Sequence, residues 1–208
     1  MSYVFNVRKE CANWIASGDW NVCGTLNFAV GKKPNMRQAN WLWSSFWNRL
    51  DLICHGKSRG EQRRIPRFVY IHDGGCDDNA HSHFLAKTTT NVPEFCILLN
   101  AIWAGMHEMT ADANQNEILP VFNKRAAAWY LMHEDQGYQM NGFSDQLTHL
   151  PPGNQVLRPD ALDRMALAVP DENHLDDATR TYNVQLAKAQ LRYAKRVKAR
   201  NIGPSQTS

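Results

Sequence analysis

The chain has 208 residues, of which 43 % are hydrophobic and seven are tryptophan, enough for one domain with a substantial core plus an appendage. The net charge of +3 permits a nucleic-acid partner but does not require one. Five scattered cysteines without a C-x-x-C pair argue against a disulfide framework and a cysteine zinc site, and they favour a reducing compartment. No apolar stretch reaches the roughly 20 residues of a membrane helix, and the first residues lack the order of a secretory signal. We therefore expect a cytoplasmic protein with no membrane partner.

Three elements are predicted in the first quarter of the chain. A short helix is expected over about 8–17, and a strand over 20–30, which is rich in β-branched and aromatic residues. The segment MRQANWLWSSFWNRLDLIC (36–54) predicts an amphipathic helix, because its apolar residues recur at spacings of three, four and seven. We expect the tryptophans of this helix to lie in the core.

Two strands, a helix, a strand and a second helix are predicted next. In order they are RFVYIHDGG (67–75), HSHFLAKTT (81–89), VPEFCILLNAIWAGMH (92–107), EILPVF (117–122) and NKRAAAWYLMHEDQG (123–137). Pro93 near the start of the first helix and Gly137 at the end of the second fit helix boundaries. The order β-α-β-β-α-β is typical of the α+β ferredoxin-like, or RRM-like, arrangement. Such a fold has an antiparallel sheet with helices packed on one face and the other face uncovered.

The composition changes after residue 142, so we divide the chain into a domain over 1–142 and an appendage over 143–208. The first part of the appendage is rich in Pro, Asp and Asn and predicts an extended linker with one short helix over about 160–168. A further helix is predicted over about 178–200, and no acidic residue balances its cations after Thr181. Such a helix either binds nucleic acid or remains in solvent, and the sequence leaves both open.

Residues able to bind a metal gather on the predicted second and third strands. His81 and His83 are separated by one residue, so a strand directs both imidazoles to one face. The preceding strand ends in His72 and Asp73, and a hairpin would place either side chain beside the histidine pair. Three nitrogen or oxygen ligands with open positions suit a catalytic divalent metal. Tyr130, on the following helix, would lie over the same face.

Together these features resemble the HUH superfamily of single-strand DNA endonucleases, and within it the rolling-circle replication initiators of plasmids, phages and single-stranded DNA viruses. The resemblance covers about 20–137 and rests on three motifs in order. They are the strand CGTLNF (23–28), the histidine pair in HSHFLA (81–86), and a helical Tyr130 followed three residues later by His133, where the family usually has lysine. No G-x-x-x-x-G-K-[ST] motif is present, so a fused helicase is not expected.

The resemblance implies a reaction and its partners. The histidine pair and the third ligand would hold Mn²⁺ or Mg²⁺ at one phosphate of single-stranded DNA or an origin hairpin. An all-imidazole set would favour Mn²⁺, and a carboxylate would favour Mg²⁺. Tyr130 would attack that phosphate to give a 5′-phosphotyrosine, and His133 would assist it, because a phenol has an ordinary pKa near 10. The implied function is reversible nicking that initiates rolling-circle replication in a bacterial host cell, with host helicase and polymerase as partners.

Nucleic-acid contacts are predicted from cations and one aromatic side chain near this site. They are Lys57, Arg59, Arg63, Arg64 and Arg67 before or at the start of the second strand, Tyr70 on that strand, Lys87, Lys124 and Arg125. Two other interpretations stay open. An RRM-like RNA-binding module would share the scaffold but carry aromatic residues on the central strands, and a transposase of the HUH superfamily would share the chemistry.

Overall fold

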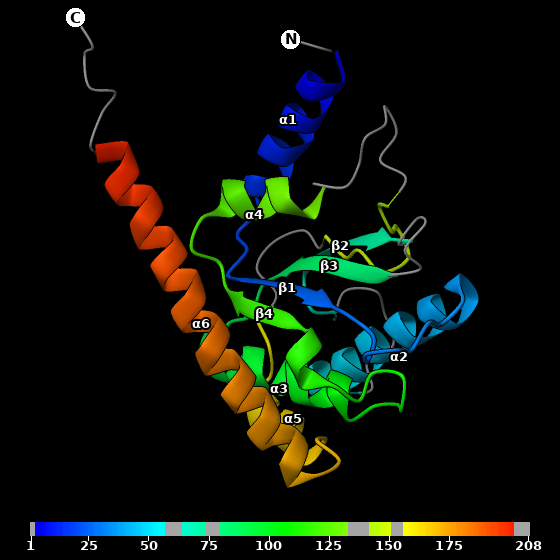
Figure 1. The fold of residues 1–208 in the computed structure, drawn as a ribbon. Helices are drawn as coiled ribbons and strands as arrows, with labels where there is room; N and C mark the ends of the chain where they lie inside the picture. Colours follow the sequence, from blue (N-terminus) through cyan, green and yellow to red (C-terminus); the bar gives the residue numbers. More distant parts are fainter. Residues whose placement is uncertain (1–2, 57–63, 74–79, 133–141, 151–155, 202–208) are drawn as a thin grey trace, which may run out of the picture.

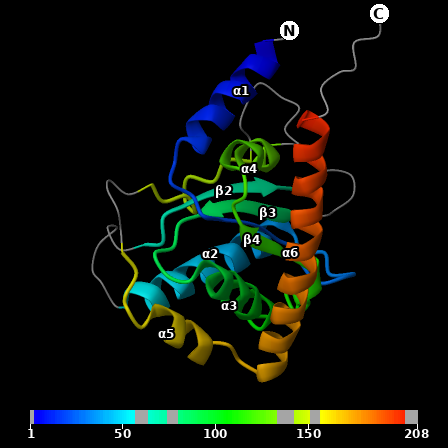
Figure 2. The same ribbon diagram turned by 90° about the vertical axis from the view of Figure 1, so that its left-hand side faces the viewer.

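A computed structural model describes residues 3–56, 64–73, 80–132, 142–150 and 156–201 (Figures 1 and 2). The fold is α+β and is built on one four-stranded antiparallel sheet, which confirms the predicted α+β class and the antiparallel sheet. Helices lie on both faces of this sheet, and one long helix runs past its edge (Figures 1 and 2). None of the helices in these ranges is long and apolar enough to span a membrane.

The sheet consists of β1 (Val22–Leu26), β2 (Arg67–His72), β3 (His81–Ala86) and β4 (Glu117–Pro120). The strands lie in the order β2-β3-β1-β4, and each neighbouring pair is antiparallel. β3 is paired on both sides and is buried along its whole length. The histidines of β3 therefore lie inside the sheet and not at an exposed edge.

One face of the sheet is covered by α2 (Met36–His55) and α3 (Val92–Ala104) (Figure 1). Asn35 and Asn91 cap these helices with their side chains, which satisfies amide groups of the first turn. The larger core between helices and strands includes Leu42, Phe46, Leu50, Phe84, Phe95, Leu99 and Trp103. The predicted burial of the α2 tryptophans is confirmed for Trp43 and Trp47 but not for Trp41, which is 61 % exposed.

The opposite face carries α1 (Tyr3–Ala16) and α4 (Lys124–Leu131), so the expectation of an uncovered face is wrong (Figure 1). A second, smaller core lies here and consists of Ala12, Ile15, Trp20, Phe68, Tyr70, Leu85, Ala128, Leu131 and Met132. Phe68 and Leu85 alternate along their strands with residues of the larger core and so point to this face. Leaving the face uncovered would expose both side chains to water, which would cost about 1.5–3 kcal/mol of stability each. α4 therefore lies on the face that carries the histidines.

The described residues after 142 contribute to the larger core, so they do not form the extended linker that their composition predicts. Two of these residues, Phe143 and His149, form bridges with β2. α5 (Ala161–Leu167) packs against α2 and α3, and α6 (Glu172–Asn201) packs against α3 and β4. The buried apolar residues after position 142 include Leu147, Leu157, Ala161, Met165, Ala178 and Tyr182. The boundary at residue 142 therefore does not separate two cores within the described residues.

Arg67 is only 1 % exposed at the start of β2, which contradicts its predicted role as a phosphate contact. Its guanidinium donates to both carboxylate oxygens of Asp51 at 2.8 and 3.0 Å, and Nε donates to the Leu147 carbonyl at 2.7 Å. The same group lies 4.8 Å from the centre of a Trp47 ring. A charge buried this deeply needs such partners, so Arg67 serves the fold.

Replacing Arg67 with alanine should lower the free energy of unfolding by about 3–5 kcal/mol, because the Asp51 carboxylate would remain buried without its counterion. Urea unfolding followed by circular dichroism measures this change. The matched control is Arg125→Ala on the exposed surface of α4, where a change within about 0.5 kcal/mol is expected. Equal, small losses in both variants would contradict the structural role of Arg67.

Candidate metal and nucleophile site

His72, His81 and His83 form a cluster on the face of the sheet that carries α4. The register of β2 and β3 sets His72 directly opposite His81, and His83 follows two residues later on the same side of β3. One ring nitrogen of each histidine lies within 4.8 Å of the others, and all three residues are buried. The ring centroids of each pair are 4.8 Å apart. The cluster could therefore hold a metal ion.

Neighbouring oxygen atoms orient two of these rings. His72 Nε2 lies 3.0 Å from the carbonyl oxygen of Leu131, which can only accept, so this nitrogen carries the hydrogen and Nδ1 is the atom that could bind a metal. His83 Nδ1 lies 2.7 Å from the Thr25 hydroxyl on β1, so Nε2 is the atom that could bind a metal. Histidines that bind metals are held in this way, with the second ring nitrogen bonded to a carbonyl or another polar group. The donor set thus fits a divalent transition metal.

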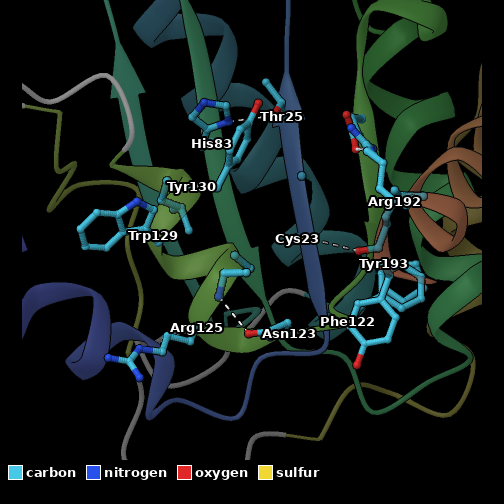
Figure 3. A pocket seen from close by; sticks show the side chains of 18 of the residues that line it. Cys23, Thr25, His83, Phe122, Asn123, Arg125, Trp129, Tyr130, Arg192 and Tyr193 are labelled. Carbon is cyan, nitrogen blue, oxygen red and sulfur yellow. Dashed lines mark hydrogen bonds and ion pairs between the residues drawn. The ribbon is translucent and has the colours of Figure 1, made fainter. Parts of the chain in front are cut away.

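α4 places Tyr130 beside this cluster. Asn123 caps the start of the helix, and near its other end the Arg8 guanidinium of α1 lies 5.1 Å from the centre of the Trp129 ring. The Tyr130 ring meets the His83 ring edge-on, with centroids 4.9 Å apart (Figure 3). Tyr130 is 53 % exposed, whereas the histidines beneath it are buried. Tyr130 and His83 line the same pocket, so a phosphate group that enters it would meet the phenol next to one of the three imidazoles.

The predicted catalytic and metal residues divide into three groups. His72, His81, His83 and Tyr130 come together as described. Asp73 is exposed at the end of β2 and does not belong to the cluster found among the described residues, so His72 is the third imidazole. His133, and the predicted DNA contacts Lys57, Arg59 and Arg63, lie outside the described residues.

Tyr70 is 2 % exposed, so it does not offer the exposed ring that was predicted for base stacking. The segment after residue 142 pairs with β2 and covers this side chain. Gly142 packs so closely that a Cβ atom there would lie 2.2 Å from the Tyr70 ring. Tyr70 belongs to the smaller core because a segment distant in sequence covers it.

The predicted cations near the site differ in how far they are available to a phosphate. Lys87 and Lys124 both bind Asp19, at 2.6 and 3.2 Å, and these two hydrogen-bonded ammonium groups lower the pKa of the Asp19 carboxyl. This contact joins the end of β3 to the start of α4. Arg125 is exposed and lines a pocket beside Tyr130, and Arg64 is partly exposed before β2.

A pocket of about 610 Å³ extends from His83 and Tyr130 toward α6 (Figure 3). Arg192 and Arg196, from the predicted cationic C-terminal helix, complete it together with Thr25, Phe122 and Tyr193, which the sequence does not single out. The C-terminal helix has cations without acidic residues to balance them, which suits the binding of an anionic ligand. No pattern in the sequence, however, predicts that this helix lies next to β4. Cys23 also lines the pocket, and burial raises the pKa of its thiol to about 12, so it is uncharged at neutral pH.

Thr25→Val should weaken Mn²⁺ binding by about 10–100-fold, because it removes the oxygen that orients His83 while keeping the side-chain shape. Isothermal titration calorimetry of the purified protein measures this affinity. Thr90→Val is the control, since its hydroxyl contacts Thr88 and not the cluster. An unchanged affinity in Thr25→Val would show that His83 does not depend on this contact.

The site therefore combines three buried imidazoles, two of them oriented by oxygen atoms, with a half-exposed phenol at one end of a cationic pocket. Comparisons of the chain with protein families, with curated proteins and with solved structures found no match.

Proposed function

We propose that this protein is a metal-dependent endonuclease of the HUH type, which nicks and rejoins single-stranded DNA and initiates rolling-circle replication of a plasmid or phage. The observation that carries the proposal is the position of Tyr130, whose ring lies 4.9 Å from His83 in a cluster of three buried histidines. A nucleophile and a metal-ligand set next to each other are what phosphodiester transesterification requires. The proposal places the protein in the cytoplasm of a bacterial host, working with the host helicase and polymerase.

The topology supports the proposal. Strand order β2-β3-β1-β4 with antiparallel neighbours is what a split βαβ unit produces, and we infer a ferredoxin-like domain from it. The histidines of β2 and β3 lie next to α4, the helix that follows β4, since His72 contacts Leu131 and His83 contacts Tyr130. This position agrees with the order of motifs in the sequence.

The three imidazoles would hold the cation, and their chemistry favours Mn²⁺ over Mg²⁺, which prefers oxygen ligands. When bound, the cation supplies Lewis-acid polarisation of a phosphate oxygen. The protein contributes the fixed orientation of His72 and His83 through the Leu131 carbonyl and the Thr25 hydroxyl. Burial of all three rings keeps water away from the ligand set.

Tyr130 would provide the nucleophile. Its hydroxyl oxygen forms a bond to phosphorus while the bond from phosphorus to the 3′ oxygen breaks, which leaves a 5′-phosphotyrosine and a 3′-hydroxyl. The phenol loses one proton and the departing 3′ oxygen takes one up. One phosphodiester is exchanged for another, so the reaction can run backwards and reseal the strand.

An RRM-like RNA-binding role finds less support in the side chains of the sheet. The two central strands present Thr25, His81 and His83 where an RNA-binding sheet carries stacking aromatics. α1 and α4 also cover part of this face. A transposase of the same superfamily would use the same residues, and the DNA sequences that the protein cuts would distinguish it from a replication initiator.

A covalent-capture experiment tests the proposal. The protein is incubated with Mn²⁺ and a random-sequence single-stranded DNA library labelled at its 3′ ends, and the products are run on a denaturing gel. We expect a labelled protein–DNA adduct, because the 3′ fragment stays on the tyrosine, and we expect none when EDTA is present. Cleavage that releases all labelled DNA with free 5′ phosphates would overturn the tyrosine mechanism, and the absence of any cleavage would overturn the function.

A further inference from the structure

α6 forms one wall of the pocket that begins at Tyr130. Its contribution consists of Ala189, Arg192, Tyr193 and Arg196, which face residues of β1, β4 and α4 across the pocket. α6 is fixed in this place by polar contacts with the segment just before β4, among them Thr181 to Asn114 at 2.8 Å and Gln185 to the carbonyl of Asn116. The wall is therefore part of the folded domain, although it lies far from the histidines in the sequence.

The pocket is suited to an anion. Its lining includes the guanidinium groups of Arg125, Arg192 and Arg196 against a single carboxylate, that of Glu117. Glu117 already forms an ion pair with Arg192 at 2.9 Å, so Arg125 and Arg196 leave the lining with an excess of positive charge. Both of these arginines are exposed and can reach a phosphate from the solvent side.

The same pocket offers a surface for a flat ring. Phe122 and Tyr193 stack on one another with centroids 6.3 Å apart and an interplanar angle of 29°. They remain 43 % and 47 % exposed, so their outer faces are open to a further ring. Figure 3 shows this pair at the end of the pocket away from His83 and Thr25. Exposed aromatic rings next to arginines are the usual means of holding an unpaired base together with its phosphate.

We propose that α6 completes a nucleotide subsite in this pocket, in which one unpaired base of a DNA strand stacks on Phe122 and Tyr193 while Arg196 binds its phosphate. The inference rests on the proposed function for its ligand, a strand whose scissile phosphate lies at Tyr130. It extends that function to a C-terminal helix that takes no part in the metal site. The pocket volume of about 610 Å³ is in the range of about 300–1,000 Å³ that holds small organic ligands.

Binding measured without metal separates this inference from the nuclease reaction. Fluorescence anisotropy of a labelled oligothymidylate is followed in EDTA for the full chain and for Phe122→Ala, Tyr193→Ala and Arg196→Ala. We expect each aromatic variant to bind about fivefold to 150-fold more weakly. We expect Arg196→Ala to reduce the slope of log affinity against log salt by about 0.7. The matched controls on α6, outside the pocket lining, are Leu191→Ala and Lys195→Ala, which should change binding much less.

The outcomes distinguish the two proposals. Oligonucleotide binding that weakens in the three pocket variants but not in the two controls, with unchanged thermal unfolding, supports the subsite even if no covalent adduct ever forms. Binding that is absent, or insensitive to all three pocket variants, overturns the subsite even if the adduct forms. A free mononucleotide that binds as tightly as the oligonucleotide would also overturn it, because the pocket would then be a site for a small metabolite.

Discussion

Tyr130→Phe is expected to abolish the covalent protein–DNA adduct, a loss of at least about 10³-fold in the rate of its formation. The substitution removes one oxygen atom, the proposed nucleophile, and keeps the ring that contacts His83. Because Tyr130 is half-exposed and ends a helix on the surface, the free energy of unfolding should change by no more than about 0.5 kcal/mol. Affinity for single-stranded DNA in EDTA should remain that of the unmodified protein.

Tyr193→Phe is the matched control for this variant. Tyr193 is exposed in the same pocket and keeps its ring after the substitution, so the adduct should form at its usual rate. The test uses the 3′-labelled DNA, Mn²⁺ and the denaturing gel described above. An adduct that persists in Tyr130→Phe and disappears in Tyr193→Phe would show that the nucleophile is Tyr193, at the other end of the pocket.

The double variant His81→Ala, His83→Ala should lose Mn²⁺ binding by at least about 10⁴-fold and lose DNA cleavage with it. Removing a hydrogen bond that merely orients a metal ligand already lowers metal affinity by about 10–100-fold, and here two ligands themselves are removed. His72 alone would remain, and a single imidazole does not retain a divalent ion at micromolar concentration. Calorimetric titration with Mn²⁺ measures the affinity, and the covalent-capture gel measures the activity.

Two controls keep this result interpretable. His107→Ala removes a histidine that contacts Trp41 and the Met109 amide away from the cluster, and it should leave Mn²⁺ affinity unchanged. Binding of the double variant to oligothymidylate in EDTA should also persist, which shows that the pocket is still folded. Cleavage that survives in the double variant would rule out the histidine cluster as the metal site of the reaction.

The histidine site follows from local rules to a large extent. Two histidines separated by one residue share a face of any strand, whatever surrounds it, because side chains alternate with a period of two. The short segment between β2 and β3 then makes an antiparallel pair the natural outcome, and the observed register sets His72 opposite His81. What the pattern leaves open is the choice between His72 and Asp73. The register of the two strands decides it, because it sets His72 opposite His81, whereas Asp73 follows the last residue of β2.

The nucleic-acid contacts show the opposite case. Arg67 and Tyr70 are residue types that often bind nucleic acid, yet both are buried here. Arg67 is paired with Asp51 of α2, and Tyr70 is covered by the segment after residue 142. Lys87 and Lys124 have an acidic partner in Asp19. Exposure and pairing depend on segments far apart in the chain, so a charge in the sequence does not reveal whether it faces solvent.

The sequence by itself determined the α+β class, the strand that carries both histidines, and the helix that carries Tyr130, because hydrophobic periodicity and helix caps act over a few residues. Only the tertiary structure decided that α1 and α4 cover the second face, that His72 completes the cluster, and that α6 closes a cationic pocket beside Tyr130. These outcomes depend on which apolar surfaces meet. The stabilisation gained by burying apolar surface is roughly proportional to the buried area and does not depend on direction. Segments at any distance along the chain can therefore provide it.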